Sequence, residues 1–405
     1  MPGVSNVVVP GFVFWSMKSL PAHSRIVPQN RTARAASIGP HRWPDPWSST
    51  PAVLAKSMQQ VITFVPETGE APSEFMARFV SELKRNDGAV LMVMAYGSVS
   101  AHAVTMEQLE RMPGGVDWPV LWVEGANCFG GELAGFQVFI LPGAKIERLR
   151  HAGRVVGSIF HDGGARHCLL AGLMPADATR PRAEQCEEFF ESTAEVLALA
   201  GFSYGDIART WFYNDDILAW YDDFNRVRTA FYAKQKFTTG SLPASTAVRG
   251  RNPRGAALTF GAWAVVPDSP DTAVREVASP LQCPAPAYGS SFSRATEILL
   301  SGVKRLLVSG TASIEPGGKT VWQGDPVKQI ALTMDVVEAI LRPRGMSHRD
   351  VTRATAYFKQ AADVAIFQNW LTAHDLSAMP VVLVHCDICR DDLLFEIELD
   401  ACVTS

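Results

Sequence analysis

An internal repeat constrains the fold of this chain more than any other feature. Residues 201–213 and 345–357 carry Gly, Ser, Asp, Arg and Tyr at the same five positions, at a constant offset of 144 residues. Each copy follows a helical pattern that stops at a glycine, and each precedes a second helical pattern. We therefore expect two units with the same order of helices and strands.

The hydrophobic pattern around each copy predicts the same elements. Three- and four-residue spacing indicates the helices, and alternation indicates the strands. The common order is strands, helix, strand, helix and two strands, so the predicted fold is α+β, with two units that are each a mixed sheet covered on one face by two helices. The predicted helices are 183–200, 217–232, 326–341 and 363–374, and the predicted strands are 166–172, 207–213, 243–248, 256–265, 305–310, 351–358, 380–389 and 393–399.

Composition breaks mark the expected domains. Residues 1–44 contain five basic residues, six prolines and no acid, which predicts a disordered basic extension over 1–50. Residues 267–286 contain five prolines, which predicts a linker over 267–285. We expect a first domain over 51–266 and a second over 286–405, in a protein that is a monomer or a homotrimer.

The overall composition indicates a globular protein that binds a small molecule. The 405 residues are 47% hydrophobic with a net charge of -4, which gives no reason to expect nucleic acid as a partner. No stretch approaches 18 uninterrupted apolar residues, so no membrane span is expected. The seven cysteines are scattered through apolar segments, which favours reduced thiols and a cytoplasmic location.

The second unit resembles the Rid (YjgF) family, also described as a chorismate mutase-like fold, over residues 286–405. The duplication, the segment 243–246 (Pro-Ala-Ser-Thr), the strand 309–313 (Ser-Gly-Thr-Ala-Ser) and the spacing from Cys389 to Glu396 are similar more specifically to chorismatases. That resemblance implies a degenerate Rid-like first domain and a catalytic Rid-like second domain.

The resemblance also implies an activity. Chorismatases are cofactor-independent enzymes, of the hydrolase or lyase type, that split the enolpyruvyl ether of chorismate into pyruvate and either a cyclohexadiene acid or a hydroxybenzoate. The expected substrate is therefore chorismate or a related small carboxylate. No cofactor and no metal site are expected, since the pair Cys386 and Cys389 has no second pair of ligands.

The last predicted strand carries the expected acid. The resemblance implies catalysis by Glu396, and alternation places Glu396 and Glu398 on one strand face. Two nearby carboxylates on a partly buried face favour one protonated form, as a general acid requires. The alternative is that both form ion pairs on an exposed edge strand. The corresponding strand 256–262 of the first unit has no acid, so only the second unit is expected to be catalytic.

Arginines among aromatic residues are the expected carboxylate ligands. Alternation places Ile207, Arg209, Trp211 and Tyr213 on one strand face, and Arg353 repeats the arrangement. We predict substrate binding by Arg209, Trp211, Tyr213 and Arg353, with Arg226 as a further candidate and Arg228 exposed to solvent. The alternatives for Arg209 and Arg353 are ion pairs with Asp206 and Asp350, or cation–π contacts.

Two positions bear on the product. In chorismatases the product type goes with Gly or Ala after the Pro-Ala-Ser-Thr segment and with Cys or Gln about seven residues before the glutamate, so Ala247 and Cys389 are expected at the site. Here they point to different product types. Cys389 is a catalytic candidate, and its alternative is a small buried hydrophobic residue.

Two other functions stay open. The first is a Rid-type imine or enamine hydrolase, which would need an arginine two residues after Pro380, where the chain has Val382. The second is a non-catalytic protein that binds small acids on the same scaffold.

Overall fold

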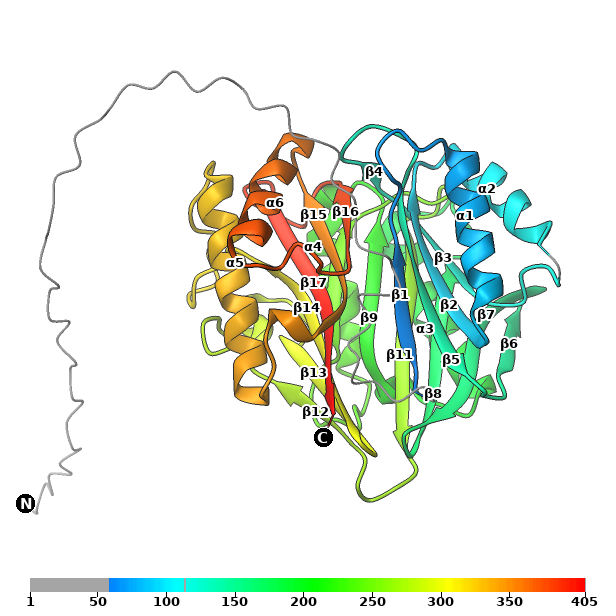
Figure 1. Ribbon diagram of the computed structural model, residues 1–405. Coiled ribbons are helices and arrows are strands. Elements are labelled where there is room, and N and C mark those ends of the chain that lie inside the picture. The colour runs from blue at the N-terminus through cyan, green and yellow to red at the C-terminus, as the bar shows by residue number, and fades with distance from the viewer. Residues whose placement is uncertain (1–57, 113, 405) are drawn as a thin grey trace, which may run out of the picture. The chain divides into compact units, whose positions relative to one another are not determined.

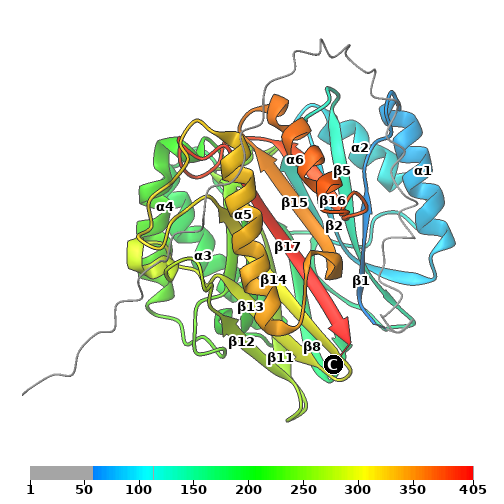
Figure 2. The same ribbon diagram turned by 60° about the vertical axis from the view of Figure 1, so that its left-hand side comes forward.

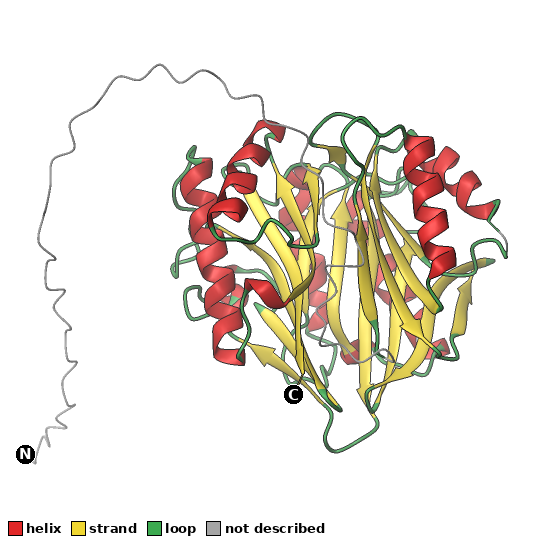
Figure 3. Cartoon of the chain, in the orientation of Figure 1, coloured by secondary structure: helices red, strands yellow, loops and turns green. Residues whose placement is uncertain are grey.

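The computed structural model describes residues 58–112 and 114–404. The predicted extension over residues 1–50 lies outside the described residues. Strands gather in the centre and helices lie on the outside (Figure 3). The strands form three sheets that follow one another along the chain, and we call them the first, middle and last sheet. Among the described helices, none is long and apolar enough to cross a membrane.

The first sheet has the strand order β1-β5-β2-β3. Helices α1 and α2 cover its outer face (Figure 1). The pairing of β2 with β3 is parallel, whereas β5 is antiparallel to both of its neighbours. The elements are β1 (Gln60–Phe64), α1 (Pro72–Arg85), β2 (Gly88–Gly97), α2 (Ala101–Glu110), β3 (Val120–Glu124) and β5 (Leu133–Pro142).

The middle sheet contains the first copy of the repeat. Its strand order is β10-β9-β11-β8-β7-β6, and β9 and β10 are parallel. Gly201, with a φ of +69°, follows α3 and allows the tight turn before β9. The elements are β6 (Glu147–His151), β7 (Arg154–Asp162), β8 (Ala165–Leu173), α3 (Arg182–Leu199), β9 (Ile207–Asn214), α4 (Ile217–Tyr232), β10 (Ala244–Arg249) and β11 (Leu258–Pro267).

The last sheet contains the second copy and has the order β12-β13-β14-β17-β15-β16-β4. Asp325 caps α5 by accepting a hydrogen bond from the backbone N–H of Lys328, and Pro326 begins the helix. The elements are β4 (Ala126–Asn127), β12 (Ala273–Val277), β13 (Ala295–Leu300), β14 (Val303–Ala312), α5 (Pro326–Leu341), β15 (Val351–Phe358), α6 (Val364–Ala373), β16 (Val381–His385) and β17 (Phe395–Thr404).

The same four-strand order therefore occurs three times: β1-β5-β2-β3, β8-β11-β9-β10 and β14-β17-β15-β16. In each sheet one helix follows the first of these strands (β1, β8 or β14), and another follows the strand that comes next in the chain (β2, β9 or β15). The α+β class and the mixed sheets agree with the sequence prediction. The number of units does not, because β1, β2, β3 and β5 form a sheet of their own that the repeat did not reveal.

Two local predictions also differ from the structure. Ile207 packs with the helix-side cluster of the middle sheet, whereas Ala208 packs with the central cluster, because a register shift between Trp263 and Ala264 changes the alternation. The predicted linker contains β12, which pairs with β13 at the edge of the last sheet. The predicted domain boundaries stay a prediction.

The inner faces of the three sheets pack against one another. Figure 2 shows the helices of each sheet on the side away from the other sheets. Equivalent tyrosines of β2, β9 and β15 (Tyr96, Tyr213 and Tyr357) are fully buried there. The hydroxyls of Tyr213 and Tyr357 lie 3.2 Å apart, and the Tyr96 hydroxyl lies 3.1 Å from Oγ1 of Thr355. The polar groups of all three sheets thus meet in one interior.

Candidate active site

The last strand, β17, places two carboxylates on the face that looks toward the middle sheet. Strand β17 lies between β14 and β15, so its side chains are enclosed on both flanks. Glu396 is 5% exposed and Glu398 is fully buried. Burial on this scale disfavours a charged carboxylate unless cations or hydrogen bonds compensate it. The two carboxylates receive different amounts of compensation.

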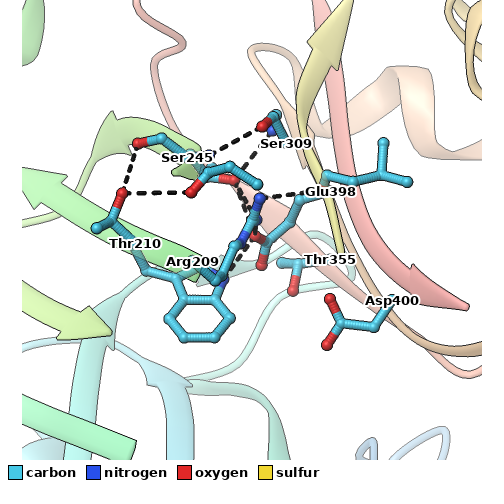
Figure 4. Close-up of polar contacts among 12 residues, drawn as sticks. Arg209, Thr210, Ser245, Ser309, Thr355, Glu398 and Asp400 are labelled. Carbon is cyan, nitrogen blue, oxygen red and sulfur yellow. Dashed lines mark hydrogen bonds and ion pairs between the residues drawn. The ribbon is translucent and has the colours of Figure 1, made fainter. Parts of the chain in front are cut away.

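Glu398 is surrounded by donors (Figure 4). It forms ion pairs with Arg209 and, at 2.9 Å, with Arg353. It also accepts hydrogen bonds from the indole N–H of Trp211 at 2.7 Å and from the hydroxyl of Thr246 at 2.8 Å. Burial alone would raise the pKa of Glu398, but Arg353 and Arg209 together lower it to about 2. Glu398 is therefore a fixed negative charge.

Asp400 completes this buried network. Its two oxygens accept hydrogen bonds from Nε and Nη2 of Arg353 at 2.8 and 3.1 Å. The guanidinium of Arg209 also donates to the carbonyl of Val308 at 3.0 Å. Two arginines thus face two carboxylates, and the network is neutral overall. Removing one member would leave an uncompensated buried charge.

Glu396 has less compensation, since Arg209 and Arg390 act on it through their charge alone. Within residues 58–112 and 114–404, no hydrogen bond or ion pair to its carboxyl group is found. Burial, and next the negative charge of Glu398, raise the pKa of Glu396 to about 8. The carboxyl group is therefore mainly protonated at neutral pH, and it can donate a proton. The predicted inequality of the two carboxylates is found, and its cause is mainly burial.

Gly310 makes room for Glu396. A Cβ atom at Gly310 would lie 2.1 Å from Oε1 of Glu396, which is far inside van der Waals contact. The backbone N–H of Gly310 donates to Oγ1 of Thr246 at 3.1 Å. The glycine of the Ser-Gly-Thr segment in β14 therefore matters because it has no side chain. Any side chain at position 310 would displace the carboxyl group of Glu396.

A small cavity between the middle and last sheets contains Glu396 in its wall. Ala247, Gly310 and Cys389 also line it. Its free volume is about 30 Å³, which is close to the space of one water molecule. Since a ring-sized ligand needs more space than this, long side chains of the wall must move when one binds.

Three arginines line the same cavity: Arg228, Arg294 and Arg390. None of them forms an ion pair with a carboxylate of the described residues. Arg228 and Arg294 are 1% and 3% exposed, and Nε of Arg228 has no hydrogen-bond partner. Arg228 lies over Phe224 and Arg294 over Phe292, at 4.9 and 5.4 Å from the ring centres. Buried guanidinium groups without an anion suit a ligand that brings carboxylates.

Three sequence predictions concern residues of this wall. Ala247 and Cys389 do line the cavity beside Glu396. Cys389 follows β16 in a loop, and not on a strand as predicted, because β16 ends at His385. Burial, and next the charge of Glu396, raise the pKa of the Cys389 thiol to about 12. Cys389 is therefore a neutral thiol. The exposure predicted for Arg228 is wrong, since α4 turns this side chain inward.

The other predicted ligands lie elsewhere. Arg209, Trp211 and Arg353 belong to the network of Glu398, and both arginines also lie over the Trp211 ring, at 5.2 and 5.3 Å. The cation–π alternative is thus found, but the predicted partners are not. Asp206 and Asp350 instead accept hydrogen bonds from the backbone N–H groups of Ser203 and Ser347. None of these residues lines the cavity.

Tyr213 and Arg226 also lie away from the cavity wall. Tyr213 contacts Tyr357 in the interior, and Arg226 is an exposed residue of α4 that pairs with Asp223 at 3.1 Å. The structure therefore gives the predicted ligand Arg226 a surface position. The arginines that sequence reasoning missed, Arg294 and Arg390, occur in loops without a periodic pattern. What marks these arginines is that they line the cavity without a carboxylate partner, and this is visible only in the structure.

The described residues contain no group of His, Cys, Asp and Glu side chains that could hold a metal ion. Cys386 is buried, and burial raises the pKa of its thiol well above the usual value. Glu396, Cys389 and three arginines are the groups of the cavity wall that could donate a proton or hold an anion.

Comparison with known proteins gives this site a context. A family model described as Endoribonuclease L-PSP matches residues 285–403. The chain is 28% identical over 271 residues to a chorismatase of Streptomyces hygroscopicus, covering 61% of this chain and 77% of that protein. It is 26% identical over 265 residues to a 3-hydroxybenzoate synthase of the same organism, covering 59% and 74%.

A crystal structure of a chorismatase has the same fold. It covers 87% of this chain and 100% of its own, with a TM-score of 0.62 and 19% sequence identity. The resemblance to chorismatases with a Rid-like fold, predicted from the sequence, is confirmed by these comparisons.

Proposed function

We propose that this homologue of chorismatases cleaves the enolpyruvyl ether of chorismate, or of a closely related dicarboxylate, with Glu396 as the general acid. The observation that carries the proposal is the setting of Glu396. It is a buried carboxyl group with a pKa of about 8, in the wall of a cavity that also contains three arginines without a carboxylate partner among the described residues.

The arginines match the charge of the substrate. Chorismate has one carboxylate on its ring and another on its enolpyruvyl group. Arg228, Arg294 and Arg390 supply three positive charges at one cavity. Each guanidinium can grip a carboxylate with two parallel hydrogen bonds. Binding would replace the aromatic contacts of Arg228 and Arg294 and the two hydrogen bonds that Arg294 donates to the carbonyl of Cys283, and movement of these long side chains would open the cavity.

The proposed reaction starts with proton transfer from Glu396 to the methylene carbon of the enol ether. The double-bond electrons form the new C–H bond and leave an oxocarbenium ion. Water adds to the cationic carbon, and the resulting hemiketal breaks its bond to the ring oxygen, which releases pyruvate and the ring alcohol. One proton of the water returns to Glu396 on addition, and the other, on the hemiketal hydroxyl, passes to the ring oxygen as its bond to carbon breaks. A ring hydroxyl could replace water as the nucleophile, and Cys389 and Ala247 stand where they could direct that choice.

The fixed charge of Glu398 assists this chemistry. Its negative charge raises the pKa of Glu396, so that the acid stays protonated near neutral pH. Arg209, Trp211 and Arg353 then act as positioning residues that keep Glu398 ionised.

The Rid-type imine hydrolase has less support. The arginine that it would require is replaced by Val382, which is fully buried and packs toward Gly135 of the first sheet. No cation stands at that position to hold a substrate carboxylate.

Incubation of the full chain with chorismate tests the proposal. Pyruvate would be followed by the oxidation of NADH in a coupled lactate dehydrogenase assay, and ring products by chromatography. We expect pyruvate from the wild type and a loss of at least 100-fold in Glu396→Gln. Glu147→Gln, an exposed residue of β6, is the matched control with full activity. A wild type that releases no pyruvate, or a fully active Glu396→Gln variant, would contradict the proposal.

A further inference from the structure

A second cavity lies between the first and middle sheets. It is larger than the one at Glu396, with a free volume of about 430 Å³. This is within the usual size of small-molecule sites. Residues of α2, β3, β6, β7, β8 and β11 line it, together with the loop after Asn252. It therefore occupies another boundary between two sheets of the same topology.

The strand registers show that this cavity is the counterpart of the proposed active site. Thr259 of β11 lies opposite Tyr213 of β9, as Glu396 of β17 lies opposite Tyr357 of β15. The repeat relates Tyr213 to Tyr357, so Thr259 takes the place of Glu396. Thr259 lines the second cavity, as Glu396 lines the first.

The remaining walls correspond in the same way. On β3, Trp122 comes one residue before the residue that pairs with Tyr96. On β10, Ala247 likewise comes one residue before the residue that pairs with Tyr213. Both Trp122 and Ala247 line their cavities. The second cavity has thus kept the position of a ligand site, but it has no carboxylic acid at the catalytic position. A threonine hydroxyl cannot replace a carboxylic acid as a proton donor to carbon.

The chemistry of the second cavity indicates the ligand. Arg150, Arg154 and Arg254 line it, and none of them has a carboxylate partner within the described part of the chain. All three are exposed residues; partial burial, and next the charge of Arg254, lower the pKa of Arg154, so these two positive charges repel each other and an anion between them would be stabilised. The acidic residue in the wall is Glu110 on α2, which is exposed.

The inner wall is apolar and aromatic. Val116, Val120 and Trp122 form part of it. The indole N–H of Trp122 has no hydrogen-bond partner, although this side chain is only 4% exposed. This N–H is closed off from the cavity space, so Trp122 offers a ligand its aromatic ring and not its N–H. The wall therefore suits a planar ring.

We propose that this second cavity binds a ring carboxylate, of the hydroxybenzoate or cyclohexadiene carboxylate class, and holds it without converting it. The carboxylate would lie at the arginine rim and the ring against Trp122. The choice of ligand class rests on the proposed function, whereas the cavity and its arginines do not depend on whether Glu396 is catalytic.

Isothermal titration calorimetry with 3-hydroxybenzoate tests the proposal. The titrations would use the full-length wild type, Arg154→Ala/Arg254→Ala, and the control Arg275→Ala, which removes an exposed charge of β12. We expect binding to the wild type and the control, and a rise of at least tenfold in the Kd of one site in the double variant. Trp122→Ala should raise the same Kd about tenfold, since it removes the aromatic surface against which the ring would lie.

The outcomes are decisive in each case. No binding of 3-hydroxybenzoate to the wild type at millimolar concentration would overturn the proposal. Unchanged binding in the double variant would overturn it too, because all binding would then occur elsewhere, for example at Glu396. A Glu396→Gln variant that releases no pyruvate but keeps the Trp122-dependent site would separate this inference from the proposed activity.

Discussion

The substitution Glu396→Gln should change how the stability of the fold depends on pH. In the folded chain the pKa of Glu396 is raised to about 8 from an ordinary value of 4.5, mainly by burial. The unfolded chain therefore loses this proton at a lower pH than the folded chain. Between pH 4.5 and 8 the unfolded state binds fewer protons, so the free energy of unfolding of the wild type falls as the pH rises. Glutamine does not titrate, and its variant lacks this contribution.

The magnitude follows from the size of the shift. One pKa unit corresponds to about 1.4 kcal/mol, so a shift from 4.5 to about 8 is worth about 5 kcal/mol when the transition is complete. Between pH 5 and 8 most of it is expressed, and the wild type should lose about 3 to 4 kcal/mol more than the variant over this interval. Below pH 4.5 this contribution is constant.

Urea unfolding at pH 5 and pH 8 measures this difference. The quantity of interest is the change in unfolding free energy between the two pH values, compared between wild type and Glu396→Gln, because titrations shared by both proteins cancel. Glu147→Gln serves as the control for the loss of one carboxylate at the surface. If wild type and Glu396→Gln lose stability in parallel, Glu396 is ionised in the folded protein, and our reason for treating it as a proton donor is refuted.

Three further predictions follow from the same geometry. The turnover of chorismate should fall about tenfold per pH unit above pH 8, as Glu396 loses its proton, and a flat profile of kcat from pH 7 to 10 would contradict the role of Glu396 as the acid. Arg209→Ala should lower the free energy of unfolding by about 3 to 5 kcal/mol, because it leaves the buried Glu398 with one cation fewer, and a variant of wild-type stability with only a raised KM would show that Arg209 is a substrate ligand. Gly310→Ala should reduce kcat by at least tenfold with a smaller effect on KM, because its Cβ would displace Oε1 of Glu396, and steady-state kinetics with unchanged kcat would show that the position of this oxygen is not critical.

The repeat made the middle and last sheets predictable. Helix α4 and strand β15 have the predicted bounds, because Gly201 and Gly345 mark turns and the hydrophobic spacing is regular. The first sheet escaped detection because its strand β2 keeps only Tyr96 of the repeated residues, and Met92 stands where the other copies have arginine. Burial preserves a sheet as long as its side chains stay apolar, so its sequence can diverge without losing the topology.

The candidate site was predictable in part. Alternation placed Glu396 and Glu398 on one face, and the spacing to Cys389 was informative because both residues do line one cavity. The ligands were harder to predict. Arg209 fits the pattern of an inward-facing arginine, but the pattern cannot tell whether its anion belongs to the protein or to a ligand. Only the contact between β9 and β17 shows that this anion is Glu398.

The three equivalent positions opposite the buried tyrosines hold Glu396, Thr259 and Gly135. In a symmetric assembly of three identical subunits, a substitution at this position would change every interface at once. A single chain that contains all three sheets removes that constraint, since each boundary is encoded separately. One boundary could therefore acquire a proton donor, a neighbouring one a hydroxyl and the remaining one close packing, without any of these changes harming the others.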